Sequence, residues 1–118
     1  MTEQSYIIEL KSRWPTDEPH NREASLETLT LADEAVRAFP QSPKLWVIRG
    51  DLLQLGPEDS PYPLEESLVC YKRAIEIDAK FAEAWESAAH FYDAMLADEL
   101  AAAPYFREFE RLKGSHAA

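Results

Sequence analysis

The stretch Tyr71-Lys-Arg-Ala-Ile-Glu-Ile-Asp78, closely followed by Ala82-Glu-Ala-Trp85, contains the end of one apolar stripe and the start of another. Tyr71 and Ile75 are four residues apart and belong to the first stripe, and Trp85 belongs to the second. Apolar residues that recur at every third or fourth position lie on one face of a helix. Because Asp78-Ala-Lys80 interrupts this spacing, the stretch predicts two amphipathic helices joined by a short turn.

The same helical spacing recurs on both sides of this stretch. Proline-rich segments at 15–21, 39–43 and 56–63 interrupt it, because proline lacks a backbone N–H and disfavours a helical residue before it. No segment alternates apolar and polar residues with a period of two, so no strand is expected. The expected helices are 3–14, 22–39, 43–55, 63–78, 81–96 and 99–113. The predicted fold class is therefore all-α.

Residues near the expected helix ends support these limits. Ser42 can cap a helix that begins at Pro43, since proline loses no hydrogen bond at the first helical position. Asn21 is expected to cap the second helix in the same way. Pro104 leaves two alternatives: the sixth helix is kinked there, or it begins at Pro104 after a turn through 101–103.

A spacing of 39 residues links equivalent positions along the chain. It separates Ile7 from Trp46, Trp46 from Trp85, and Ala35 from Ala74. A fixed period in this range indicates stacked supersecondary units. One domain is therefore expected over 1–118, in which units 1–40, 41–79 and 80–113 precede a tail of 114–118.

The residues inside these units resemble the tetratricopeptide repeat, whose pattern is Trp, Leu-Gly, Tyr, Ala, an aromatic, Ala and Pro. The matching positions are Trp46, Gly50, Leu53, Ser67, Tyr71 and Ala74 in the middle unit, Trp85, Ala88, Ala89, Tyr92, Ala102, Phe106 and Phe109 in the third, and Ile7, Leu10, Lys11, Trp14, Thr28, Ala32, Ala35 and Pro40 in a degenerate first. Gly50 and Ala74 are expected where paired helices approach closely. Arg49 and Ala79 depart from the usual Leu and Pro, and the period exceeds the usual ~34 residues because the loop inside each of the first two units is longer.

The resemblance implies an α-solenoid of about three antiparallel helix pairs, a right-handed superhelix whose concave face is lined by the first helix of each pair. The groove residues that it implies are Ser5, Ile8, Ser12, Lys44, Val47, Asp51, Gln54, Glu83, Glu86, His90 and Asp93. They predict an apolar centre at Ile8 and Val47 and an acidic C-terminal end. Such a surface suits a basic or amphipathic peptide. A clamp for a peptide carboxylate needs Lys, Asn and Arg, and the groove offers only Lys44.

The function expected from this fold is a non-catalytic protein–protein interaction module, an adaptor or scaffold for a protein or peptide partner. Three alternatives stay open. The groove acids can form a solvated helix face without a ligand. The stiff loops 15–21 and 56–63 can provide a second contact surface, or can be mere loop variation. Finally, the chain can be a structural module that forms a homodimer through its first helix pair, since Arg107 and its polar neighbours give the sixth helix the outer face of a terminal cap.

The formal net charge of −10 disfavours nucleic acid and anionic membranes as partners, because their phosphates attract basic surfaces. The chain lacks the basic start and apolar run of a signal peptide and any apolar stretch of membrane-spanning length, so a cytoplasmic location is expected. Cys70 is the only cysteine, which excludes an intramolecular disulfide and a cysteine-based metal site.

Catalytic and metal sites have few candidate residues. Glu86, His90 and Asp93 share one helical face but form a weak zinc set, so neither a metal nor a cofactor is expected. Cys70 lies within an amphipathic helix, where packing is the simpler role. His20 lies in a loop and His116 in the expected tail. The sequence contains no catalytic motif, so the chain is not expected to be an enzyme.

Overall fold

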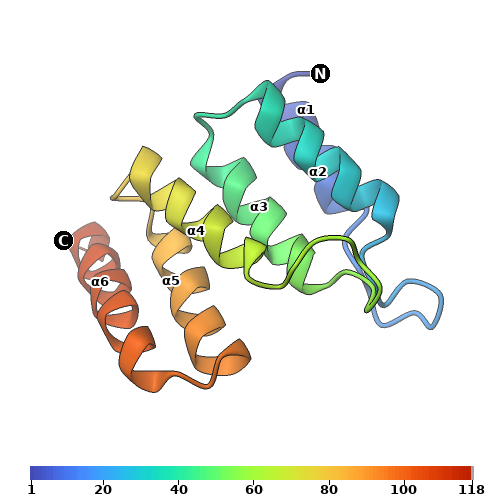
Figure 1. The fold of residues 1–118 in the computed structure, drawn as a ribbon. Helices are drawn as coiled ribbons and strands as arrows, with labels where there is room; N and C mark the ends of the chain where they lie inside the picture. Colours follow the sequence, from blue (N-terminus) through green and yellow to red (C-terminus); the bar gives the residue numbers. More distant parts are fainter. Residues whose placement is uncertain (118) are drawn as a thin grey trace.

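The computed structural model describes the backbone of residues 1–117 and the side chains of residues 1–114, so the side chain of His116 lies outside the described residues. The described chain is entirely helical and contains no strand (Figure 1), which confirms the predicted all-α class. Its elements are α1 (Glu3–Ser12), α2 (Leu26–Ala38), α3 (Pro43–Gln54), α4 (Glu66–Ile77), α5 (Ala82–His90), the π-helical turn η1 (Phe91–Met95) and α6 (Glu99–Ala117).

The start of α3 confirms the predicted cap, whereas the start of α2 does not. Ser42 Oγ accepts the N–H of Leu45 at 3.2 Å, and Pro43 is the first helical residue. The predicted cap at Asn21 is wrong, because Ser25 caps α2 instead. Asn21 belongs to a turn in which its carbonyl accepts the N–H of Thr16 at 2.7 Å. This turn keeps the chain out of helical geometry until Ser25 is reached.

The third helix pair differs from the prediction at both of its helices. The expected helix 81–96 ends at His90 and continues as the π-helical turn η1, in which the N–H of Leu96 donates to the carbonyl of Phe91. The sixth helix begins at Glu99 and runs through Pro104, so it does not start at the proline. Its first turn is held by Asp98, whose side chain accepts the N–H of Ala101 at 3.0 Å. The helix also extends beyond 113 into the expected tail.

The helices pack on one another in chain order. Each consecutive pair of helices is in contact, and α3 also contacts both α1 and α5 (Figure 1). Two groups of buried side chains hold them together. One centres on Leu10, Leu29 and Leu45 and joins α1, α2 and α3, and the other includes Tyr71 and Phe91 and joins α3, α4 and α5. α3 therefore contributes to both cores.

The small residue Gly50 allows α3 and α4 to approach closely, as the sequence predicted. A Cβ atom at Gly50 would lie 2.6 Å from Cε1 of Tyr71 and 3.1 Å from the carbonyl oxygen of Ser67. Real Cβ atoms do not come this near to a ring carbon. The ring of Tyr71 is fully buried, so it occupies the space that a larger side chain at residue 50 would need.

The two junctions between helix pairs have the same local structure, 39 residues apart. The indole N–H of Trp46 donates to the carbonyl of Pro40, and the indole N–H of Trp85 donates to the carbonyl of Ala79, each at 2.9 Å. α2 and α4 also end alike: the backbone N–H of the C-cap residue donates to the carbonyl of Ala35 in α2 and of Ala74 in α4. The spacing found in the sequence thus corresponds to a repeated geometry.

Arg49 is 6% exposed. Its guanidinium donates to Glu66 at 3.2 Å and to the Sγ atom of Cys70 at 3.0 Å, and it lies over the ring of Tyr62. Asp33 of α2 is 3.7 Å away. Arg49 therefore joins α2, α3 and α4 by charge, where an aliphatic residue would join them by apolar contact alone.

Candidate functional site

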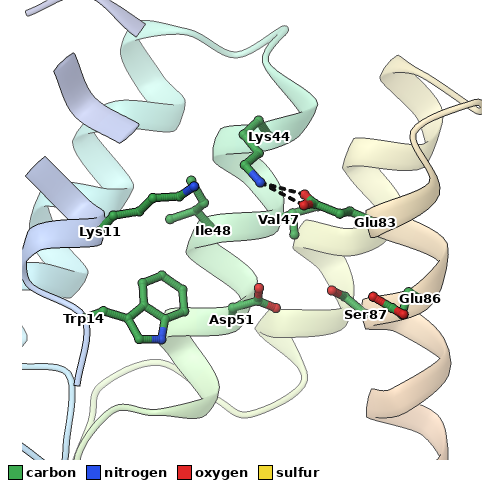
Figure 2. Close-up of a pocket in the computed structure, with 9 residues that line it drawn as sticks. All are labelled: Lys11, Trp14, Lys44, Val47, Ile48, Asp51, Glu83, Glu86 and Ser87. Atoms are coloured by element: carbon green, nitrogen blue, oxygen red, sulfur yellow. Dashed lines mark hydrogen bonds and ion pairs between the residues drawn. The ribbon is translucent and has the colours of Figure 1, made fainter. Parts of the chain in front are cut away.

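A pocket with a volume of about 340 Å³ opens between the first helices of the three pairs. Its lining residues are Lys11 and Trp14 at the end of α1, Lys44, Val47, Ile48 and Asp51 of α3, and Glu83, Glu86 and Ser87 of α5 (Figure 2). We call this pocket the α1–α3–α5 groove. Because α3 contacts α1 on one side and α5 on the other, its exposed face forms the floor of the groove.

Part of the predicted set of groove residues lies in this pocket. Lys44, Val47, Asp51, Glu83 and Glu86 all line it. They come from α3 and α5, where equivalent positions 39 residues apart face the same side. The ion pair between Lys44 and Glu83, one such pair of equivalent positions, joins the two helices across the groove.

The remaining predicted residues do not line the groove. Ile8 is 60% exposed and does not line this pocket, whereas Val47 does, so the apolar centre expected at Ile8 and Val47 stays a prediction. Gln54 donates to the hydroxyl of Tyr71 at 2.6 Å. His90 packs edge-on against Phe106 of α6, with ring centroids 5.2 Å apart. The others contact their own helix or solvent: Ser5 donates to the carbonyl of Thr2, Ser12 donates to that of Glu9, and Asp93 is exposed on η1.

The sequence reasoning missed Lys11, Trp14, Ile48 and Ser87, which also line the groove. Lys11 lies three residues after Ile8, on the same face of α1, so helical spacing could have found it. Trp14 follows the end of α1 at Ser12. Its position depends on where that helix stops, which the apolar spacing did not locate.

Asp51 is the most enclosed acid of the groove. Its Oδ1 accepts the hydroxyl of Tyr71 at 2.6 Å. Burial raises the pKa of Asp51 above its ordinary value, the hydrogen bond from Tyr71 lowers it, and the charge of Glu83 raises it again. A hydrogen bond from Ser87 and the charge of Lys44 also lower it, by less. The net pKa is raised, so the site holds a carboxylate whose negative charge is poorly compensated by its surroundings.

Lys44 of the groove is already paired with Glu83. Lys44 Nζ lies 2.9 Å from Oε1 and 2.8 Å from Oε2 of Glu83 (Figure 2). Among the described residues, the side chains of Glu86 and Lys11 have no hydrogen bond and no ion pair. The groove therefore presents two carboxylates, Asp51 and Glu86, that are not paired with a cation of the chain.

The candidate residues for metal binding, Glu86, His90 and Asp93, and the candidate nucleophile Cys70 lie in settings that do not favour these roles. In the described part of the chain, no three His, Cys, Asp or Glu side chains converge as metal ligands do. The π-helical turn begins directly after His90, which removes Asp93 from the helical phase of Glu86 and His90. Burial raises the pKa of Cys70 to about 11 although the charge of Arg49 lowers it. This thiol is therefore protonated near neutral pH.

The two proline-rich loops lie against each other. The N–H of Ala24, just after the first loop, donates to the carbonyl of Leu55 at 2.7 Å, just before the second. Pro57 and Pro19 line the same pocket at this edge. The helices of residues 1–117 include none that is both long enough and apolar enough to cross a membrane.

Comparison of the chain with protein-family models, with curated proteins and with solved structures found no match. A function for this chain must therefore be inferred from the chemistry of the groove.

Proposed function

We propose that this chain is a non-catalytic protein–protein interaction module of the tetratricopeptide kind. In this proposal, three antiparallel helix pairs stack as a short α-solenoid, and a segment of a partner protein binds in the α1–α3–α5 groove. The observation that carries the proposal is the groove itself, to which every pair contributes side chains. A surface built across successive pairs suits an extended ligand rather than a small compact one.

The composition of the groove supports a peptide with basic and apolar residues. Val47 and Ile48 provide an aliphatic floor, and Trp14 provides an aromatic edge. Three acids face two lysines in the lining, and one acid is neutralised by the pair of Lys44 with Glu83. Apolar contact provides most of the affinity of such an interface, whereas its charges select the partner and orient it.

Selection from a displayed peptide library tests this proposal. The immobilised protein is expected to enrich a family of related peptides, and the double variant Asp51→Lys with Glu86→Lys is expected not to retain them. The double variant Glu58→Lys with Asp59→Lys makes the same charge change on the exposed loop and should retain them. Equal retention by the groove variant, with helicity unchanged by circular dichroism, would contradict the proposal.

A structural homodimer is a second candidate, and one observation favours it at the start of α6 and not at the first helix pair. Leu100 at the start of α6 is 89% exposed, and Met95 and Leu96 nearby are also exposed. Exposed apolar clusters of this kind often mark an interface. Light scattering over a dilution series is the test: a dimer that Leu100→Glu dissociates supports this candidate, and a monomer at all concentrations rejects it.

A further inference from the structure

We infer that the α1–α3–α5 groove recognises an arginine side chain of its partner, with the guanidinium stacked on Trp14 and paired with Asp51 and Glu86. This inference rests on the proposed function and names the ligand group that decides its specificity. It follows from three features of the groove: acids without an ion pair, an indole whose N–H has no acceptor among the described residues, and an aliphatic floor.

The first feature is the unpaired negative charge. The carboxylate of Asp51 accepts hydrogen bonds from the hydroxyls of Tyr71 and Ser87 but forms no ion pair, and the side chain of Glu86 has no hydrogen bond or ion pair within the described residues. Lys44 is held by both carboxylate oxygens of Glu83, and although its charge lowers the pKa of Asp51, the net pKa of Asp51 stays raised. A half-buried carboxylate without a counterion is destabilised. A cationic ligand would supply the missing charge.

The second feature is Trp14. The other two indoles of the chain donate their N–H to backbone carbonyls, at Pro40 and Ala79. In the described chain no such acceptor exists for Trp14, which is half-buried at the edge of the groove. Figure 2 shows its ring across the groove floor from Asp51. An aromatic ring beside a carboxylate is a place where a flat cation can bind to both groups.

The third feature distinguishes arginine from lysine. A guanidinium is planar, stacks on an aromatic ring and has five N–H donors, so it can bond to two carboxylates at once. An ammonium is a compact charge that cannot stack. The methylene groups of an arginine would lie on Val47 and Ile48, which line the groove on the turn of α3 that precedes Asp51. The groove thus provides a contact for each part of the arginine side chain.

The test uses N-acetyl-arginine methylamide as the probe and ¹⁵N-labelled protein. The chain has three tryptophans, so its spectrum contains three indole N–H signals, and Trp14→Phe assigns the one of interest. Titration is expected to shift the Trp14 signal and to leave those of Trp46 and Trp85 in place. The neutral isostere N-acetyl-citrulline methylamide should bind roughly ten-fold more weakly or not at all, since it lacks the charge.

Two variants separate the groove from general electrostatic attraction. Asp51→Asn is expected to lower the affinity for the arginine probe roughly ten-fold. Asp59→Asn makes an equal charge change on an exposed loop and is expected to leave this affinity unchanged. The inference is overturned if the Trp14 signal does not move, if all three indoles move together, or if citrulline binds as well as arginine. If library peptides still depend on the groove while the arginine probe fails, the inference fails and the proposed function stands. If no peptide depends on the groove, the proposed function itself fails.

Discussion

Lys44 and Glu83 occupy equivalent positions 39 residues apart, and their side chains form an ion pair with Nζ 2.8 Å from Oε2. The pair joins α3 to α5 across the groove. It also removes the one lysine of α3 from the acids that face it, which leaves Asp51 and Glu86 available to a ligand.

Breaking this pair from either side should change ligand binding in opposite directions. Lys44→Gln leaves Glu83 unpaired and makes the groove more acidic, so the affinity for N-acetyl-arginine methylamide should rise severalfold. Glu83→Gln leaves Lys44 without its partner and should lower this affinity. Because both side chains are partly exposed, each variant should change the free energy of unfolding by less than about 1 kcal/mol. Probe titration and urea unfolding measure the two effects, and a change of affinity in the same direction for both variants would contradict this account.

Gly50→Ala should destabilise the protein by about 1–3 kcal/mol, although alanine is the better helix former. The added Cβ would lie 2.6 Å from the buried ring of Tyr71, so the ring or α4 must shift. Gly114→Ala is the matched control, because Gly114 is also in a helix and a Cβ there meets nothing within 4 Å. The control should stabilise by up to about 1 kcal/mol. Urea unfolding measures the change in the free energy of unfolding for each variant. Equal changes at both positions would refute the close approach of α3 and α4.

Trp46→Phe and Trp85→Phe should each lower the free energy of unfolding by about 1 kcal/mol. Each change keeps an aromatic ring but removes one indole hydrogen bond to a carbonyl, at Pro40 and Ala79 respectively. Since the two bonds have equal length in equivalent junctions, the two losses should be similar, and the double variant should lose their sum to within ~0.5 kcal/mol. Chemical unfolding of the three variants measures this. A loss at only one junction would show that the two are not equivalent in energy.

Asp51→Asn should stabilise the protein at neutral pH while it weakens ligand binding. The pKa of Asp51 is raised in the folded state, mainly by burial, so its ionised form opposes folding at pH values above that raised pKa. Below the ordinary pKa of an aspartate, the carboxyl is neutral in both states and the penalty is absent. The advantage of the asparagine variant should therefore be present at pH 7, shrink as the pH falls through the raised pKa, and vanish near pH 3. Urea unfolding of both proteins at several pH values measures this difference in the free energy of unfolding. A difference that grows as the pH falls would contradict the raised pKa of Asp51.

Cys70 should react with a thiol reagent such as DTNB at pH 8 more slowly in the native protein than in the urea-unfolded chain, by a factor on the order of a hundred or more. The thiol is fully buried, and burial raises its pKa to about 11, so both its access and its thiolate fraction are small. The absorbance of the coloured thiolate that DTNB releases measures the rate of the reaction. A fast native reaction would reopen the question of a nucleophilic role.

The helical class and the register between units could be predicted from the sequence because both depend on local features. Helical spacing follows from the backbone geometry of each segment, and the helix start at Pro43 requires only Ser42 beside it. The 39-residue period linking Trp46 to Trp85 is likewise a property of the linear chain. It corresponds to two junctions with the same hydrogen bonds.

Only the tertiary structure decided which side chains meet in the groove. The end of α1 at Ser12 brings Trp14 to its edge, and the π-helical turn after His90 takes Asp93 out of phase. The sequence likewise did not predict that Arg49 is buried between acids of α2 and α4. Helical spacing is set within a few residues of each position, so a single sequence contains it directly. The ends of helices, the direction of a side chain beyond them and the pairing of a buried charge depend on contacts between segments that are distant in the chain, and these exist only once the helices have packed.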